Sequence, residues 1–313
     1  MPIETQFTRA NGLRMAYETF GQASAPPVVL IQGLQTQMLG WPEPFCRALA
    51  EHGYCVVRFD NRDIGLSEKL PQLGRPNLLL MLVKGWLRLR RSAAYTLDDM
   101  AQDTLGLIEA LGFSSAHIVG ASMGGMIAQL MAARYHDRVR SLTSIMSSSG
   151  DPKLPGPTRK VRRALWSSPD DNTHEAAIQQ SLTLWRLISS PRYPPDPAAL
   201  EAFVRESAAR GEPSSYGGER QLAALIAAGS RVDVLQTIRR PSLVIHGEND
   251  PLVPLAAGVD TARLIPEARL EVIPGMAHDL PRQLTDRLSN LIAGHLRQAD
   301  AQRKASAEEG ASR

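Results

Sequence analysis

The sequence predicts an α/β fold with a mostly parallel central sheet, helices on both faces and an inserted helical cap. Short apolar runs rich in β-branched residues alternate with helical stretches along most of the chain, as in sheets buried between two layers of helices. From 151 to about 230 prolines cluster and helical stretches follow one another without a strand, and the alternation resumes at Pro241. We therefore expect a core of 1–150 and 231–298, a cap of 151–230 and a disordered tail of 299–313.

The expected elements follow one another in a regular order. A hairpin that turns at Asn11-Gly12 forms an antiparallel edge, and Thr96 with Asp99 forms a capping pair at the start of a helix. Ligands of open α/β folds bind at the carboxyl ends of the parallel strands, so we expect the cap to lie over that edge. The hairpin strands are expected at 4–9 and 14–20, and buried strands at 28–31, 55–59, 117–119, 139–145, 243–245 and 270–273. Helices are expected at 43–52, 97–111, 123–135 and 282–296.

Composition and charge exclude several classes of protein. Basic residues number 35 and acidic residues 32, a small excess that does not indicate a nucleic-acid partner. Residues 1–11 are polar where a signal peptide would be apolar, and no apolar run approaches the ~18 residues of a membrane span, so we expect a cytoplasmic protein. Cys46 and Cys55 are too few for a disulfide scaffold or a thiolate metal site. With no dinucleotide fingerprint and no zinc-ligand cluster, we expect neither a metal nor an organic cofactor.

The strongest motif is Gly120-Ala121-Ser122-Met123-Gly124, directly between an expected strand and an expected helix. In a G-x-S-x-G turn of this kind the glycines relieve crowding, and the serine hydroxyl is held up at the sheet edge. The alternative interpretation is a plain glycine-rich turn. The strand and helix on either side favour Ser122 as a nucleophile.

A serine nucleophile needs a base within hydrogen-bond reach and an acid that orients this base. His278 and Asp250 lie in loops directly after expected strands, in the chain order serine, acid, histidine. We therefore predict His278 as the general base and Asp250 as its acid. The rivals are Glu248 and Asp279 for the acid and His246 for the base; the other histidines lie in helices, in the cap or at the far end of a strand.

An oxyanion hole in such a turn uses two backbone N–H groups. One belongs to the residue after the nucleophile, Met123, and the other to the loop after an earlier strand, where Leu34 follows Gln32 and Gly33. The alternative for this loop is an ordinary strand-to-helix turn.

Taken together, these segments resemble the α/β-hydrolase superfamily from residue 28 to about 296. Residues 60–67 look like its D-x-R-x-x-G-x-S stretch and residues 247–254 like its G-x-x-D-x-x-x-P acid loop. The combination is most similar to esterases of the aclacinomycin methylesterase type and to haloperoxidase-like esterases. A departure is Gln32, where the superfamily often has histidine.

The resemblance implies a carboxylic ester hydrolase that works through an acyl-enzyme on a small-molecule ester. A cap that contributes apolar side chains suggests a moderately apolar substrate, although most of these side chains are expected to form the cap's own core. The alternatives are a carbon-carbon bond hydrolase, a proline iminopeptidase-like peptidase and, as a different class, a non-catalytic binding protein on the same fold. The apolar residues of the cap are Trp166, Leu182, Leu184, Trp185 and Leu187.

One further segment, 77–91, is apolar except for a narrow basic stripe. As a helix it places Lys84, Arg88 and Arg91 on one side of an apolar cylinder too short to span a bilayer. One hypothesis places it at the pocket mouth, with its apolar side against the cap and substrate. The other places it on a membrane surface. Its position between the early strand-end loop and the helix at 97–111 favours the pocket mouth.

Overall fold

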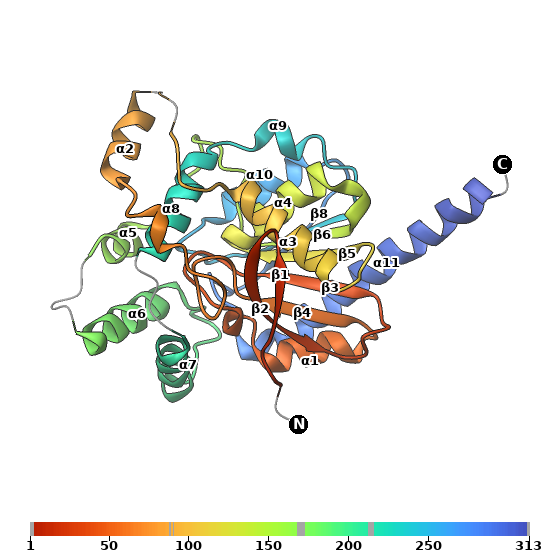
Figure 1. Ribbon diagram of the computed structural model, residues 1–313, viewed down its shortest axis with the longest axis horizontal. Coiled ribbons are helices and arrows are strands. Elements are labelled where there is room, and N and C mark those ends of the chain that lie inside the picture. Colours follow the sequence, from red (N-terminus) through yellow and green to blue (C-terminus); the bar gives the residue numbers. More distant parts are fainter. Residues whose placement is uncertain (1–2, 88, 90, 168–172, 212–215, 312–313) are drawn as a thin grey trace.

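The computed structural model describes residues 3–87, 89, 91–167, 173–211 and 216–311, and an eight-stranded sheet lies at its centre (Figure 1). Across the sheet the strands lie in the order β1 (Gln6–Ala10), β2 (Leu13–Phe20), β4 (Cys55–Phe59), β3 (Pro27–Ile31), β5 (Ala116–Ala121), β6 (Val139–Ile145), β7 (Ser242–Gly247) and β8 (Arg269–Ile273). β2 is antiparallel to both β1 and β4, and every pair from β4 to β8 is parallel. The mostly parallel sheet with an antiparallel edge is therefore confirmed.

Two apolar clusters cover the two faces of this sheet. One contains buried side chains of α3 (Leu97–Ala110), α4 (Met123–Arg134) and α10 (Leu255–Leu264). The other contains those of α1 (Glu43–Glu51) and α11 (Thr285–Ala311). Each strand from β3 to β7 is buried along almost its whole length because helices pack on both of its faces.

A run of helices lies between β6 and β7, as expected for an inserted cap. They are α5 (Arg159–Leu165), α6 (His174–Ile188), α7 (Pro197–Ala209), α8 (Gly217–Ala228) and the short α9 (Val232–Leu235). α6 and α7 pack against each other through a small apolar core of Ile178, Leu182, Leu200 and Val204. Among the described residues, no helix is both long enough and apolar enough to cross a membrane.

The prediction of a disordered tail at 299–313 is wrong, because α11 continues to Ala311. Asp300 accepts a hydrogen bond from His117 in β5 (3.2 Å), and Arg303 donates to Ser115 (2.7 Å). The tail is also rich in alanine and charged residues, which favour helix. These long-range contacts anchor the first part of the tail on the amino-terminal end of the sheet.

α11 also contributes a buried histidine that makes stability depend on pH. His295 donates to the carbonyl of Leu142, and burial lowers its pKa from 6.5 to about 4. Between pH 6.5 and 4 the unfolded chain therefore binds a proton that the folded chain excludes. The contribution of His295 to the free energy of unfolding should fall by about 2–3 kcal/mol over this window, and stay flat above it.

Urea unfolding of the wild type and of His295→Gln at pH 7.5 and 4.5 measures this contribution. The glutamine keeps a donor for Leu142 but does not titrate, so its loss of stability on acidification should be smaller by that amount. Comparing the two proteins cancels the effect of His117 and His246, whose pKa values burial also lowers. Equal losses in both proteins would contradict the prediction.

Candidate active site

Ser122 lies in a sharp turn between β5 and α4. Its backbone has φ 56° and ψ −121°, a conformation that L-residues rarely adopt. The flanking glycines allow this turn: a Cβ on Gly120 would lie 2.1 Å from the carbonyl oxygen of Gly124, and one on Gly124 would lie 2.1 Å from that of Ile31. The segment therefore has the strained geometry of a nucleophile elbow, with Ser122 half-buried at the start of α4.

Asp250 and His278 meet at the same edge of the sheet, in the loops after β7 and β8. Nδ1 of His278 donates to Oδ2 of Asp250 at 2.7 Å, and both side chains are buried. The other carboxylate oxygen accepts from the backbone N–H groups of Leu252 and Val253 at 2.9 and 2.8 Å. Asp250 is therefore fixed from both sides, and the proton on Nδ1 leaves Nε2 of His278 free to accept.

The structure brings Asp250 and His278 together, but it does not show a hydrogen bond between His278 and Ser122. Within the described ranges, neither Oγ of Ser122 nor Nε2 of His278 has a hydrogen-bond partner. Catalytic hydrogen bonds are often long before substrate binds and shorten in the complex.

The rival residues are held by other groups. Glu248 accepts from the N–H of Gly275, and Asp279 accepts from both the N–H and the hydroxyl of Ser190. Burial raises the pKa of Asp279 despite these bonds. His246 donates through Nε2 to the carbonyl of Val253 at 2.7 Å, and this nitrogen lies 3.6 Å from Asp250. His246 is thus a buried support of the acid loop, its pKa lowered by desolvation.

The loop after β3 passes directly beside Ser122. A Cβ on Gly33 would lie 3.1 Å from Cβ and 3.6 Å from Oγ of Ser122. Gln32 shapes the loop: its side chain accepts from the N–H of Gly33 at 2.8 Å, and its carbonyl accepts from Asn61 at 3.0 Å. In the described part of the chain, the N–H groups of Leu34 and Met123 donate to no other protein atom.

Three side chains that sequence patterns do not single out tie the cap to this loop and to the loop after β4. Gln221, fully buried on α8, accepts from the N–H of Gln35 at 2.9 Å and donates to the carbonyl of Arg62 at 2.8 Å. Arg210 binds both Gln37 and Asp60. Arg220 forms a buried two-pronged ion pair with Asp63, which lowers the pKa of that carboxyl although burial acts to raise it. Nothing local marks these contacts, since they join distant segments.

A second hydrogen-bonded set of serine, histidine and aspartate side chains lies at the opposite end of the parallel strands. Nδ1 of His117 is 2.8 Å from Oγ of Ser141, and Nε2 is 3.2 Å from Asp300. His117 and Ser141 are completely buried near the amino-terminal ends of β5 and β6. This arrangement fixes α11 on the sheet.

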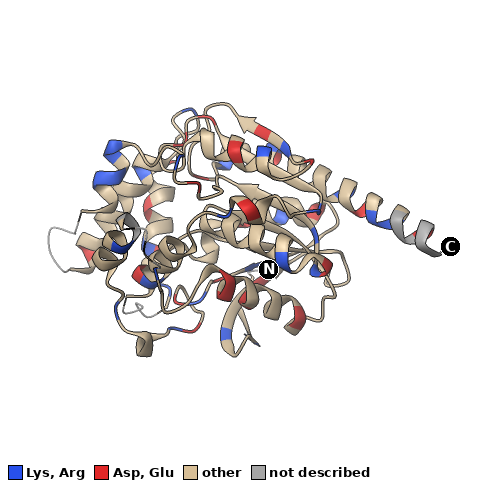
Figure 2. Ribbon diagram, turned by 90° about the horizontal axis from the view of Figure 1, so that it is seen from above, with Lys and Arg blue, Asp and Glu red and all other residues tan. Residues whose placement is uncertain are grey.

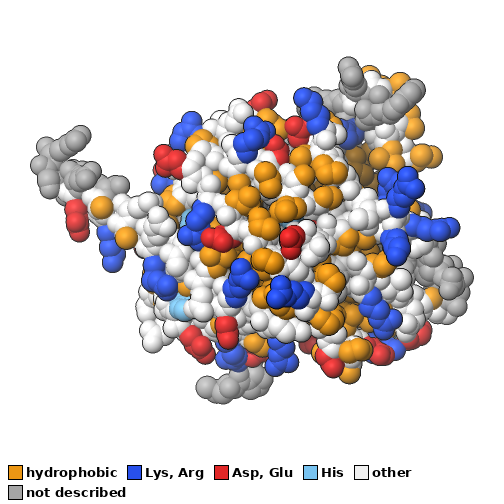
Figure 3. Space-filling model, turned by 180° about the vertical axis from the view of Figure 1, so that it is seen from behind, with side chains coloured by type: hydrophobic (Ala, Val, Ile, Leu, Met, Phe, Trp, Pro, Cys, Tyr) orange, Lys and Arg blue, Asp and Glu red, His pale blue; other side chains and the backbone are white. Residues whose placement is uncertain are grey.

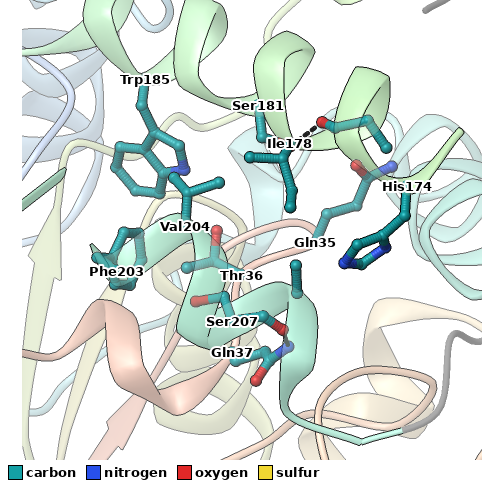
Figure 4. A pocket seen from close by; sticks show the side chains of 12 residues that line it. Gln35, Thr36, Gln37, His174, Ile178, Ser181, Trp185, Phe203, Val204 and Ser207 are labelled. Atoms are coloured by element: carbon teal, nitrogen blue, oxygen red, sulfur yellow. Dashed lines mark hydrogen bonds between the residues drawn. The ribbon is translucent and has the colours of Figure 1, made fainter. Parts of the chain in front are cut away.

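A pocket of about 150 Å³ lies between α6, α7 and the loop that follows Leu34 (Figure 4). Trp185 and Phe203 meet edge to face on one side of it, with ring centroids 5.3 Å apart, and Gln35 and His174 lie on the other. Of the apolar cap residues, Leu182 is in the cap's own core, Trp185 lines this pocket, and Trp166 is 60% exposed. The pocket is therefore part apolar and part polar, and adjoins the loop beside Ser122.

A sequence profile of the alpha/beta hydrolase fold matches residues 26–281. The chain therefore belongs to the α/β-hydrolase fold family and is a hydrolase. It is 28% identical over 317 residues to the rhodomycin D methylesterase DauP of Streptomyces sp. strain C5, covering 95% of this chain and 99% of the relative.

Carbon-carbon bond hydrolases are also among the similar proteins. The chain is 28% identical over 236 residues to a 2-hydroxymuconate semialdehyde hydrolase of Pseudomonas putida, covering 71% of this chain and 76% of the relative. The solved structure of the meta-cleavage product hydrolase CumD from Pseudomonas fluorescens IP01 matches with a TM-score of 0.72 at 23% identity, covering 94% of this chain and 98% of that one.

Proposed function

We propose that the chain is a serine hydrolase that cleaves carboxylic esters, with Ser122 as nucleophile, His278 as general base and Asp250 as the acid. The observation that carries the proposal is the 2.7 Å bond between His278 and Asp250, at the sheet edge where the strained turn presents Ser122. The two rival acids, Glu248 and Asp279, are bound to other groups.

The reaction proceeds in two halves. Nε2 of His278 removes the proton of Ser122 as Oγ attacks the ester carbonyl, and the N–H groups of Leu34 and Met123 stabilise the oxyanion. His278 then protonates the departing alcohol, which leaves an acyl group on Ser122. A water molecule, deprotonated by His278, attacks this acyl-enzyme; His278 then returns the proton to Oγ of Ser122 as the bond to the acyl group breaks and the acid leaves. Asp250 keeps the imidazole in the required tautomer throughout. All of these steps use protein groups alone, so we propose a reaction without metal or cofactor.

The substrate we propose is a small, moderately apolar ester. A pocket of about 150 Å³, whose lining includes Gln35 to Gln37 of the loop beside Ser122 but neither Ser122 nor His278, is close to the size that holds one benzene ring in other proteins. Its mixed lining suits an aromatic or short aliphatic group that carries a polar substituent. The methylesterase relative points to the same bond type.

A substrate panel tests the proposal against its alternatives. The full-length chain is assayed with aryl and methyl esters of increasing acyl length, with a vinylogous 1,5-diketone for carbon-carbon cleavage, and with a proline arylamide for peptidase activity. We expect the highest kcat/KM on a short or aromatic ester. A higher kcat/KM on the diketone would make the chain a carbon-carbon bond hydrolase. Absence of turnover on every substrate, together with no labelling by a fluorophosphonate, would favour a binding protein.

A further inference from the structure

Helix α2 (Leu78–Trp86) presents apolar side chains to solvent instead of to the cap. Leu79, Leu82 and Val83, at helical spacing on one face, are 73%, 42% and 44% exposed, and Leu80 beside them is 48% exposed. Met81, on the opposite face, is buried where α2 contacts α8. The expectation that the apolar side packs against the cap at the pocket mouth is therefore wrong for these residues. Just beyond the helix, Leu87 and Leu89 are 51% and 55% exposed.

The sequence around α2 is basic. Between Glu68 and Asp98 the sequence has no acidic residue, and its basic residues are Lys69, Arg75, Lys84, Arg88, Arg90 and Arg91. α5 adds four exposed basic residues, with Leu165 and Trp166 exposed after them. α2 and α5 lie at the same end of the molecule, opposite the projecting α11 (Figures 1 and 3). Figure 2 shows a group of Lys and Arg on one helix at this end, with Asp and Glu on the helices beside it.

We propose that α2 is a membrane-surface anchor that inserts its apolar face into a bilayer of anionic lipid. Leucines on one face with basic residues around them are the features of a helix that lies in the lipid interface. The charge decides between a bilayer and a second copy of the chain. Two copies that met through this face would bring their basic residues together, whereas anionic head groups neutralise them. α2 is too short to span a bilayer, so the binding is peripheral and reversible.

Sedimentation of the full-length chain with vesicles tests the proposal. We expect binding to phosphatidylcholine vesicles that contain phosphatidylglycerol and little binding to phosphatidylcholine alone. Binding should weaken between about 0.1 M and 1 M salt, as the screening length falls from ~10 to ~3 Å. Leu79→Ser combined with Leu82→Ser should lower the partition coefficient roughly a hundredfold, about tenfold for each leucine. Lys84→Gln combined with Arg91→Gln should lower it about tenfold and reduce its salt dependence.

Matched variants control for loss of apolar surface and charge elsewhere. Phe7→Ser with Val259→Ser removes side chains that are 46% and 45% exposed on β1 and α10, and Arg263→Gln with Arg269→Gln removes two charges far from α2. Both controls should bind vesicles like the wild type. Equal binding by the leucine variant, or no preference for anionic vesicles, would overturn the proposal. The proposal would also be overturned if sedimentation velocity without vesicles showed a dimer for the wild type and a monomer for the leucine variant. A second copy of the chain would then cover α2. None of these readouts depends on Ser122.

Discussion

Replacing Ser122 by alanine should lower kcat on the preferred ester by roughly 10⁴- to 10⁶-fold, the loss seen when the nucleophile of a serine triad is removed. The alanine keeps the Cβ that the turn already accommodates at φ 56°, so it adds no steric strain. The thermal unfolding midpoint should therefore stay near that of the wild type, while labelling by a fluorophosphonate disappears.

Ser141→Ala is the matched control, because Ser141 also bonds to a histidine that contacts an aspartate. It should keep both labelling and turnover, at some cost in stability as His117 loses a partner in the core. If Ser122→Ala were still labelled and Ser141→Ala were not, the nucleophile would be at the other edge of the sheet.

Asp250→Asn should lower kcat by about 10⁴-fold. A carboxylate only accepts, and so holds the proton on Nδ1 of His278; an amide can donate to Nδ1 instead and move the proton to Nε2, where the base must accept. The geometry should persist, because Oδ1 still accepts from Leu252 and Val253. Single-turnover kinetics separates this loss from any change in substrate affinity.

Glu248→Gln and Asp279→Asn serve as controls in the same two loops. Each should retain kcat within about tenfold of the wild type, since an amide oxygen can still accept from Gly275 or Ser190. If Glu248→Gln instead lowered kcat by about 10⁴-fold and Asp250→Asn stayed active, Glu248 would be the acid that orients His278.

The core elements were predictable because their signals are local. β4 and β6 lie at 55–59 and 139–145, where short runs of apolar and β-branched residues indicate strands buried on both faces. The capping box of Thr96 and Asp99 opens α3 as expected. The docking of the tail on the sheet could not be predicted in this way, because the contact that anchors Asp300 is with His117, 183 residues earlier.

The residues of the candidate site also differ in whether a local sequence signal identifies them. Asp250 and His278 could be paired because each follows a strand, and parallel strands end at one edge of the sheet. The role of Gln221 could not be read, since it meets Gln35 across 186 residues, and only the fold brings the two together. Exposure of Leu79 likewise depends on how the cap packs, which periodicity does not report.

The bridge made by Gln221 bears on how this chain can be engineered. Its amide joins the backbone of Gln35, next to Leu34, to that of Arg62 in the core. In a chimaera that takes its cap from a relative, we therefore expect the loop beside Ser122 to keep its alignment only if the incoming helix supplies an amide at this position. α8 is therefore part of the structure that positions this loop. Specificity is better redesigned through Trp185 and Phe203, which line the pocket.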